Sequence, residues 1–364
     1  MPVIFFRDMF TPQGSGTLGR RFKGMGGKIR MAVVGVGHFG RFHAQKVKAL
    51  EGVELVAVAD IDRARAREVG DELGVEALTE GSELVGRVDA VSIAVPTVAH
   101  YDVAKPFLEE GVHLLIEKPI TDAAESAAEL GKLAAAKGVV LQVGHLERFS
   151  SATLALESRI SRPLYIDSQR VAPYKPRGTD VNVILDVMIH DIDLILALVK
   201  SPILSIDAAG TPVISPLEDI ANARVRFANG CVANITASRV SVKTERKMRI
   251  FQPDSYIVVD FSARNLSIMT KGAGVAPSGL PNITIEQETY EESDALEREI
   301  AAFVQAVANN APPLVSGEDG LRALQAAIMI NQSLESHREF VRSTGYFEPG
   351  ASPAVSGAPG ESDG

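Results

Sequence analysis

A histidine between carboxylates is the first group in this chain that could do acid–base chemistry. The stretch reads Asp186-Val-Met-Ile-His190-Asp191-Ile-Asp193. On a helix, Asp186, His190 and Asp193 would share one face, and the apolar residues between them predict burial. A buried imidazole needs partners, so Asp186 could orient His190 as a general base near neutral pH. A purely structural His–Asp pair is the alternative, and a metal site would need a third ligand that this spacing does not supply.

A lysine before a proline is the second such group. Residues 112–116 form an apolar strand pattern that runs directly into Glu117-Lys118-Pro119. Pro119 fixes its own φ and favours an extended Lys118. An ammonium held at that strand end could polarise a substrate hydroxyl or carbonyl. The alternative is a surface lysine before a turn, which is the ordinary place for this residue type.

Basic residues near the middle of the chain could bind an anion. Arg148 lies in Gly144-His145-Leu-Glu147-Arg148-Phe149, and Arg170, Lys175 and Arg177 follow in and near a proline-containing loop. Guanidinium and ammonium groups pair well with phosphate. We therefore expect this cluster to meet a diphosphate-bearing ligand, and a solvated loop is the alternative. The residues expected on the substrate are His145, Arg148, Arg170, Lys175 and Asp193.

A glycine-rich turn predicts where a dinucleotide would bind. Residues 31–34 read as a strand, Gly35, Gly37 and Gly40 follow in G-x-G-x-x-G spacing, and residues 41–50 read as a helix. The glycines permit a tight turn, close approach of a diphosphate and close helix packing, and the helix N-terminus attracts phosphate. Asp60 ends the next strand about twenty residues later, where an acid binds the ribose hydroxyls and favours NAD over NADP.

The cofactor site is expected at the carboxyl ends of the predicted parallel strands, where ligands of such sheets bind. The residues expected there are Gly35, Gly37, His38, Phe39, Gly40, Asp60, Pro96, His100, Glu117 and Lys118. A glycine turn in some other α/β fold is the alternative to a dinucleotide site.

The pattern of elements divides the chain in two. Strands and helices alternate over 29–149, which predicts a doubly wound parallel sheet of the Rossmann type. Over 150–345 the strand-like runs alternate in polarity, with Asn229-Gly230 as a hairpin signal, and predict a mostly antiparallel open sheet with helices. The fold class is therefore α/β. Residues 1–28 are expected to form a flexible extension and residues 346–364 a disordered tail.

Composition excludes several classes of protein. The chain has 364 residues, a net charge of −9 and one cysteine, Cys231. The acidic balance argues against a nucleic-acid partner, and no apolar run approaches the roughly 18 residues of a membrane helix. One cysteine forms no internal disulfide and fits a reducing cytoplasm. An apolar outer sheet face would need a cover, which predicts a homodimer or homotetramer.

The motifs together resemble those of the glucose–fructose oxidoreductase and inositol dehydrogenase (Gfo/Idh/MocA) family, over residues 29–340. Gly35-x-Gly37-x-x-Gly40, Glu117-Lys118-Pro119 and Asp186-x-x-x-His190 occur in the family's order and approximate separation. The resemblance implies a Rossmann domain followed by an α/β domain with an open sheet, NAD or NADP as cofactor, and hydride transfer at a sugar or cyclitol carbon. It also matches Lys118 and His190 to the catalytic lysine and histidine, and Asp186 to the aspartate one turn earlier. The family's usual glycine-rich lead-in is replaced by Asp180-Val-Asn182-Val, so we expect a different pocket roof.

Within the family, residues 144–149 and 188–193 are similar to the branch that oxidises the 3-hydroxyl of UDP-N-acetylglucosamine. That resemblance implies an NAD-dependent reaction in which His190 takes the hydroxyl proton and Lys118 steadies the developing alkoxide. The product would be a 3-keto sugar nucleotide for amination, as in certain lipid A precursors. Two alternatives stay open: a dehydrogenase or reductase of free sugars or cyclitols, and a regulatory protein that binds the dinucleotide without turnover.

Overall fold

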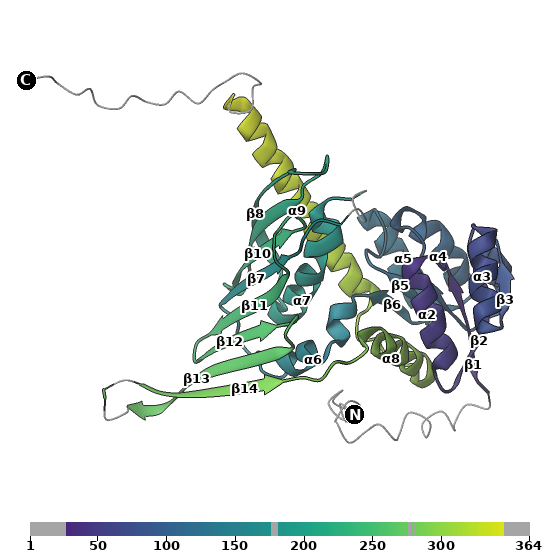
Figure 1. Ribbon diagram of the computed structural model, residues 1–364, viewed down its shortest axis with the longest axis horizontal. Coiled ribbons are helices and arrows are strands. Elements are labelled where there is room, and N and C mark those ends of the chain that lie inside the picture. The colour runs from purple at the N-terminus through teal and green to yellow at the C-terminus, as the bar shows by residue number, and fades with distance from the viewer. Residues whose placement is uncertain (1–26, 176–180, 276–277, 280, 346–364) are drawn as a thin grey trace, which may run out of the picture.

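The computed structural model describes residues 27–175, 181–275, 278–279 and 281–345. Residues 1–26 of the expected extension, the whole expected tail, and Arg177 and Asp180 lie outside these described residues. Figure 1 shows two sheets side by side, with most of the helices packed between and around them. The candidate residues come from both halves of the chain, so a shared site must lie where the two halves meet.

The first half forms a six-stranded parallel sheet in the order β3-β2-β1-β4-β5-β6. Its elements are β1 (Ile29–Val34), α2 (His38–Ala49), β2 (Val53–Ala59), α3 (Arg63–Leu73), β3 (Glu76–Leu78), β4 (Ala90–Ile93), α4 (His100–Glu109), β5 (His113–Glu117), α5 (Ala124–Lys137) and β6 (Leu141–Gly144), with 3₁₀ turns at Gly81–Leu84, Thr97–Ala99 and Leu146–Phe149. The strand order reverses between β1 and β4. The crevice at the carboxyl ends of these two strands is therefore the expected ligand site of such a sheet.

The second half forms an eight-stranded sheet in the order β14-β13-β12-β11-β7-β10-β9-β8. Its strands are β7 (Tyr165–Val171), β8 (Ile203–Thr211), β9 (Ile220–Phe227), β10 (Val232–Ser238), β11 (Glu245–Gln252), β12 (Ser255–Asp260), β13 (Asn265–Val275) and β14 (Pro281–Thr289). Among the strand pairs described in this second sheet, only β7–β10 is parallel. Gly230, at a φ of 89°, forms the predicted hairpin turn between β9 and β10. The α/β fold class and the mostly antiparallel second sheet are confirmed.

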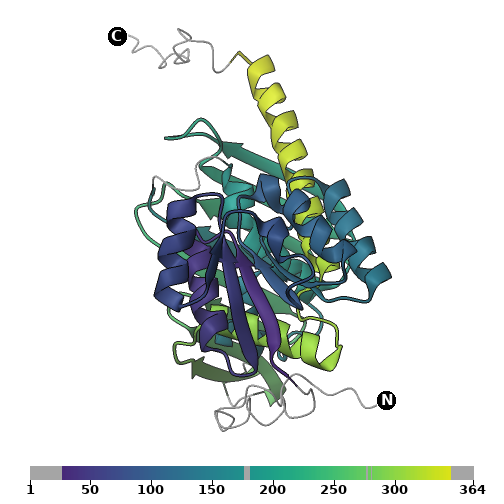
Figure 2. The same cartoon turned by 90° about the vertical axis from the view of Figure 1, so that its right-hand side faces the viewer.

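The remaining helices join the two halves (Figures 1 and 2). They are α6 (Ser151–Glu157), a π-helical turn (Ile184–Met188), α7 (Ile189–Val199), α8 (Ala295–Asn309) and α9 (Gly317–Ser343). α8 returns to the first half, where Ile300, Phe303 and Val304 join the core on one face of the parallel sheet. α9 contacts α5 and β6 of the first half and α7 and β8 of the second. Within the described residues, no helix has the length and apolarity needed to cross a membrane.

The face of the second sheet that points away from the helices carries a row of apolar side chains. Strand pairing aligns Tyr165, Phe251, Tyr256, Met269 and Ile285 across five neighbouring strands. Phe251, Met269 and Ile285 are 38%, 39% and 59% exposed. Among the described elements, Figure 1 shows none lying over this face. We call these five side chains the outer apolar row.

Candidate active site

The glycine turn opens into a cavity at the carboxyl ends of the parallel strands. The cavity has a volume of about 530 Å³, and its lining includes Gly35, Gly37, His38, Phe39, Asp60 and Pro96. A Cβ on Gly40 would overlap the carbonyl oxygen of Gly35, whereas a Cβ on Gly37 would meet no atom within 4 Å. Gly40 therefore allows helix α2 to pack against the turn, and the space at Gly37 stays available to a diphosphate. These residues fit a dinucleotide.

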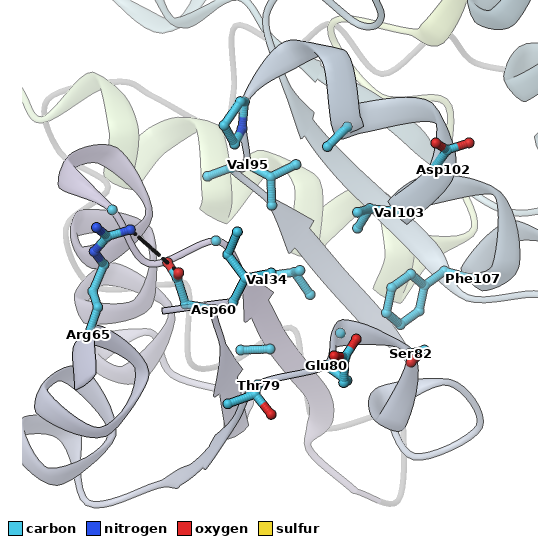
Figure 3. A pocket seen from close by; sticks show the side chains of 18 of the residues that line it. Val34, Asp60, Arg65, Thr79, Glu80, Ser82, Val95, Asp102, Val103 and Phe107 are labelled. Carbon is cyan, nitrogen blue, oxygen red and sulfur yellow. Dashed lines mark hydrogen bonds and ion pairs between the residues drawn. The ribbon is translucent and has the colours of Figure 1, made fainter. Parts of the chain in front are cut away.

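Asp60 is held in a fixed position at the end of β2, beside this cavity (Figure 3). Its Oδ2 accepts a hydrogen bond from the N–H of Val36 (2.9 Å), and its Oδ1 accepts one from the N–H of Asp62 (2.9 Å). Nη1 of Arg65, on α3, lies 3.4 Å from both carboxylate oxygens. The cavity therefore has an ordered negative charge at the predicted ribose position, with a guanidinium next to it.

His100 lies beneath the cavity surface. Its side chain is 1% exposed, and its Nδ1 and Nε2 lie 2.9 Å from the carbonyl oxygens of Pro119 and Val95. Burial lowers the pKa of His100, which favours a neutral ring that donates from one nitrogen at a time. His100 thus lies between the two loops that border the cofactor crevice and can donate to one of their carbonyl oxygens at a time.

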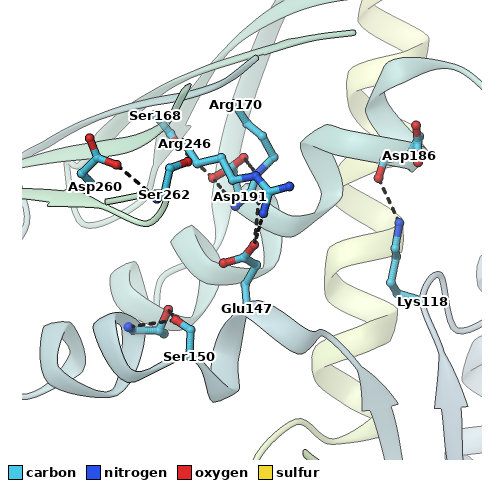
Figure 4. A network of polar contacts seen from close by, with 11 residues as sticks. Lys118, Glu147, Ser150, Ser168, Arg170, Asp186, Asp191, Arg246, Asp260 and Ser262 are labelled. Atoms are coloured by element: carbon cyan, nitrogen blue, oxygen red, sulfur yellow. Dashed lines mark hydrogen bonds and ion pairs between the residues drawn. The ribbon is translucent and has the colours of Figure 1, made fainter. Parts of the chain in front are cut away.

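Lys118 extends from the end of β5 toward the second half of the chain. Its peptide bond to Pro119 is cis, and its Nζ donates a hydrogen bond to the main-chain oxygen of Asp186 at 2.9 Å (Figure 4). Burial lowers the pKa of Lys118, and the charge of Arg170 lowers it further, whereas the carboxylates of Asp186 and Glu117 oppose that shift. Lys118 is thus in direct contact with the segment that carries His190.

The segment that carries His190 differs from the regular helix expected to place Asp186, His190 and Asp193 on one face. Residues 184–188 form a π-helical turn, and the α-helix begins at Ile189. A π-helical turn closes i→i+5 hydrogen bonds instead of i→i+4 ones, so the regular α-helical spacing expected between Asp186 and His190 does not hold. The Asp186 main-chain oxygen from this turn meets Lys118. Such turns are frequent at functional sites.

His190 presents a neutral ring to the same region. Burial lowers the pKa of His190 well below its ordinary value of 6.5, and the charges of Lys118 and Arg170 lower it further. Its Nδ1 is buried and has no hydrogen-bond partner among the described residues, which leaves Nε2 as the nitrogen that can meet a substrate. Because a neutral imidazole has a free lone pair, His190 can accept a proton.

A network of charges surrounds Asp191, the residue that follows His190 (Figure 4). Arg170, on β7, donates from Nε to Asp191 Oδ2 (2.7 Å) and from Nη1 to Glu147 Oε1 (2.8 Å). Ser168 adds a hydrogen bond to Asp191 Oδ1 (3.0 Å). Arg170 and Asp191 are 5% and 2% exposed, so Arg170, which was expected on the substrate, is enclosed by acidic partners. Lys175, farther along the chain, is exposed.

The other three residues expected on the substrate are buried together where the two halves meet. Nη1 of Arg148 lies 3.6 Å from Asp193 Oδ1, and Nδ1 of His145 lies 4.0 Å from Asp193 Oδ2. Burial raises the pKa of Asp193 and lowers that of His145. The structure thus brings these three side chains to one another and keeps them away from the open surface.

A buried cluster that the sequence patterns did not predict lies behind Lys118. Oε1 of Glu117 lies 3.0 Å from His43 Nε2, and His43 Nδ1 lies 2.8 Å from Ser92 Oγ. Side-chain atoms of His43, Glu117 and Glu299 all lie within 4.8 Å of one another. Glu299 is fully buried, and neither of its carboxylate oxygens has a hydrogen-bond partner within the described part of the chain. The signal available was its place on the apolar face of the amphipathic helix α8.

The two acids of this cluster differ in charge at neutral pH. Burial raises the pKa of Glu299 well above its ordinary value, and the charge of Glu117 raises it further. For Glu117, burial also acts upward, but the hydrogen bond and charge of His43, together with the charge of Lys118, hold its pKa below the ordinary value. Glu117 is therefore ionised, and Glu299 keeps its proton because the neutral acid is the form that burial disfavours least.

Two protein-family models match the chain in succession. Residues 29–145 match the GFO/IDH/MocA model described as an oxidoreductase family with an NAD-binding Rossmann fold. Residues 153–257 match the model of the GFO/IDH/MocA C-terminal domain. The first match covers the parallel sheet, and the second covers most of the strands that surround the candidate site.

Curated relatives extend over most of the chain. A UDP-N-acetylglucosamine 3-dehydrogenase from Acidithiobacillus ferrooxidans is 40% identical over 309 residues, which are 85% of this chain and 98% of that protein. Its solved structure is similar with a TM-score of 0.80 and the same coverage of both chains. A scyllo-inositol 2-dehydrogenase (NAD(+)) from Bacillus subtilis is 26% identical over 329 residues, 85% of this chain and 95% of that one.

A solved scyllo-inositol dehydrogenase from Lactobacillus casei, with bound NAD(H) and scyllo-inositol, has a TM-score of 0.72 and covers 85% of this chain and 98% of its own. Its identity is 22%, so it supports the fold alone. The inositol enzymes are therefore more distant from this chain than the nucleotide-sugar enzyme.

Replacement of Glu299 by glutamine tests the protonated acid. Because the folded state holds the Glu299 proton more tightly than the unfolded state, wild-type stability is highest below the unfolded pKa and falls as the pH rises toward the folded pKa, by up to about 1.4 kcal/mol per pH unit. Glutamine cannot titrate, so Glu299→Gln lacks this component. Denaturant unfolding at a series of pH values should show the stability difference between the two proteins shifting toward the variant as the pH rises.

Glu297→Gln is the control, since Glu297 lies on the same helix with a side chain that is 60% exposed. Its stability should parallel that of the wild type at every pH. The free energies of unfolding of the wild type and of Glu299→Gln are compared at each pH. A difference that stays constant across the series would show that Glu299 is ionised in the folded protein.

Proposed function

The chain belongs to the Gfo/Idh/MocA oxidoreductase family, and on that basis we propose that it oxidises the 3-hydroxyl of a nucleotide sugar such as UDP-N-acetylglucosamine, with NAD. It is an oxidoreductase acting on a hydroxyl group, which leaves the regulatory alternative without support. The substrate is proposed from the 40% identical relative. The structural observation that carries the mechanism is the hydrogen bond from Lys118 to the segment of neutral His190.

Side chains of the protein accept the proton of the substrate hydroxyl and stabilise the oxygen that loses it. NAD, when bound, would accept the hydride from the substrate carbon. Gly35, Gly37 and Asp60 would hold the cofactor in the cavity that they line. His190 accepts the hydroxyl proton at Nε2. Lys118 has three N–H donors and uses one on Asp186, so another can donate to the same substrate oxygen as negative charge develops there.

The residues expected on the substrate take three different parts in this proposal. Lys175 is exposed and is proposed to contact the substrate directly. Arg170 is enclosed by Asp191 and Glu147. We propose that it fixes the position of the helix that carries His190 and Asp191. His145, Arg148 and Asp193 are buried at the junction, where we propose that they fix the placement of the two halves. The keto product would suit a following amination, as in lipid A precursors.

The first test of this function is turnover by the purified protein. We expect NADH to form with NAD and UDP-N-acetylglucosamine, and Lys118→Met and His190→Gln to lower kcat by roughly 100- to 10,000-fold each, because each removes a group that handles the reacting proton or charge. The affinity of both variants for NADH, measured by fluorescence titration, should change only a few-fold. Since the pKa of His190 is lowered, the acid limb of kcat/KM should lie below pH 6.5.

Turnover of free inositol or glucose, with none of any nucleotide sugar, would instead assign the chain to the free-sugar and cyclitol dehydrogenases. An acid limb well above pH 7 would exclude His190 as the general base. Full activity of either variant would exclude the replaced residue from its proposed role.

We further propose that NAD is preferred over NADP because Asp60 repels a 2′-phosphate. Asp60→Asn keeps an oxygen that can accept the Val36 N–H and removes the charge, and Arg65 stays in place to meet the phosphate. The ratio of kcat/KM for NAD to that for NADP should fall by about tenfold or more, since one like-charge contact costs more than 1.4 kcal/mol. Glu80→Gln, which alters another acid of the cavity lining, is the control. An unchanged ratio in Asp60→Asn would exclude Asp60 as the discriminating group.

We also propose that two copies of the chain associate through the outer apolar row, because contiguous exposed apolar surface marks a site of association and symmetric pairing of identical chains is the commonest assembly. Strand pairing makes this row continuous from Tyr165 to Ile285. Sedimentation of the wild type should give a mass of at least two chains, and Phe251→Glu should shift it toward one. A wild-type mass of one chain would contradict this assignment.

A further inference from the structure

Arg246 is an exposed cation on the side of the second sheet that faces the active site. Side chains alternate along β11, where Met248 and Ile250 are fully buried under the helices. Arg246 shares their face because it is two and four residues away from them. Its side chain is nevertheless 51% exposed. The first residues of β11 therefore extend beyond the helices that cover this face of the sheet. Arg246 is open to solvent on the same face as Arg170.

Among the described residues, no acid accepts a hydrogen bond from the Arg246 side chain. It lies directly opposite Arg170 in the β11–β7 pairing, and two like charges in opposite positions destabilise a sheet unless they are neutralised. Arg170 donates a hydrogen bond to Asp191 Oδ2 at 2.7 Å and another to Glu147 Oε1 at 2.8 Å. Arg246 Nη1 lies 3.7 Å from that same Glu147 oxygen, and within the described residues its guanidinium donates no hydrogen bond. Figure 4 shows the two arginines together above Glu147.

The charge of Arg246 acts on the reacting group. Together with Lys118, Arg170 and His145, it lowers the pKa of His190. The two acids of this network, Glu147 and Asp191, already accept hydrogen bonds from Arg170. A guanidinium with open donors thus lies beside the Arg170 network, close enough for its charge to act on His190.

We propose that Arg246 binds a phosphate of the substrate and so sets a preference for nucleotide sugars over free sugars and cyclitols. This inference rests on the proposed oxidation of a nucleotide sugar. The planar guanidinium can give two parallel N–H donors to one phosphate, and this contact supplies the hydrogen-bonded anion that Arg246 lacks among the described residues. Arg246 is thus a specificity-determining residue that touches a part of the substrate remote from the reacting carbon.

The test compares Arg246→Gln with Arg30→Gln. Arg30 is a matched control, because its side chain is 48% exposed and pairs with Asp89 at the amino end of β1, opposite the site. In Arg246→Gln, KM for UDP-N-acetylglucosamine and the dissociation constant of UDP for the NADH-bound protein should both rise by about 10- to 100-fold, which is the range of a lost charge-assisted hydrogen bond. NADH affinity, melting temperature and kcat/KM for free N-acetylglucosamine should stay at the wild-type values.

Two further readouts separate phosphate binding from a merely structural role. Removal of the positive charge should move the acid limb of kcat/KM toward higher pH, because the charges of Lys118, Arg170 and His145 then act on His190 without that of Arg246. Arg246→Lys keeps a cation without the planar fork and should recover part of the lost UDP affinity.

The inference is overturned if Arg246→Gln binds UDP as tightly as Arg30→Gln, or if it loses nucleotide-sugar and free-sugar turnover equally. If the wild type oxidises no nucleotide sugar at all, the proposed function fails by itself, and the UDP titration of the NADH-bound proteins still decides whether Arg246 binds phosphate.

Discussion

One hydrogen bond, from Lys118 Nζ to the main-chain oxygen of Asp186, is the constraint on which the site depends. It joins residues 68 positions apart in sequence, one at the end of a parallel strand and the other in a π-helical turn beside the antiparallel sheet. The acceptor is a peptide oxygen, so it keeps its capacity to accept at every pH. Burial around this bond lowers the pKa of both Lys118 and His190, so that the packing of the two halves sets both the geometry and the protonation of the reacting groups.

Elements whose two ends are set by their own residues could be predicted from the sequence. Helix α3 is an example: it runs over Arg63–Leu73 because Asp62 accepts hydrogen bonds from the first turn and Gly74 ends the helix at a φ of 63°. Both residue types are common at helix ends, so these bounds can be read from the sequence. The glycine turn and its cavity follow from spacing in the same way. The π-helical turn could not be predicted, because distant residues hold its lead-in: Val183 N–H donates to Glu218, and Arg239 donates to Val181.

The sequence also showed which residues are basic without showing which acids neutralise them. Arg148 and Arg170 were expected at an open anion site, yet each is enclosed by carboxylates from other segments. Arg246 has the same chemistry but a different surrounding, because its strand begins beyond the helix cover. Whether an arginine is structural or free to bind a ligand thus depends on long-range pairing, which local patterns do not contain.

The return of α8 to the parallel sheet has a consequence for biosynthesis. Ile300, Phe303 and Val304 complete a core whose other members, such as Met31 and Val33, are made more than 250 residues earlier in the chain. A nascent chain on the ribosome must therefore carry one uncovered side of its first sheet until residue 309 has emerged. The core on that face of the first sheet is therefore completed only after the histidine segment has been made.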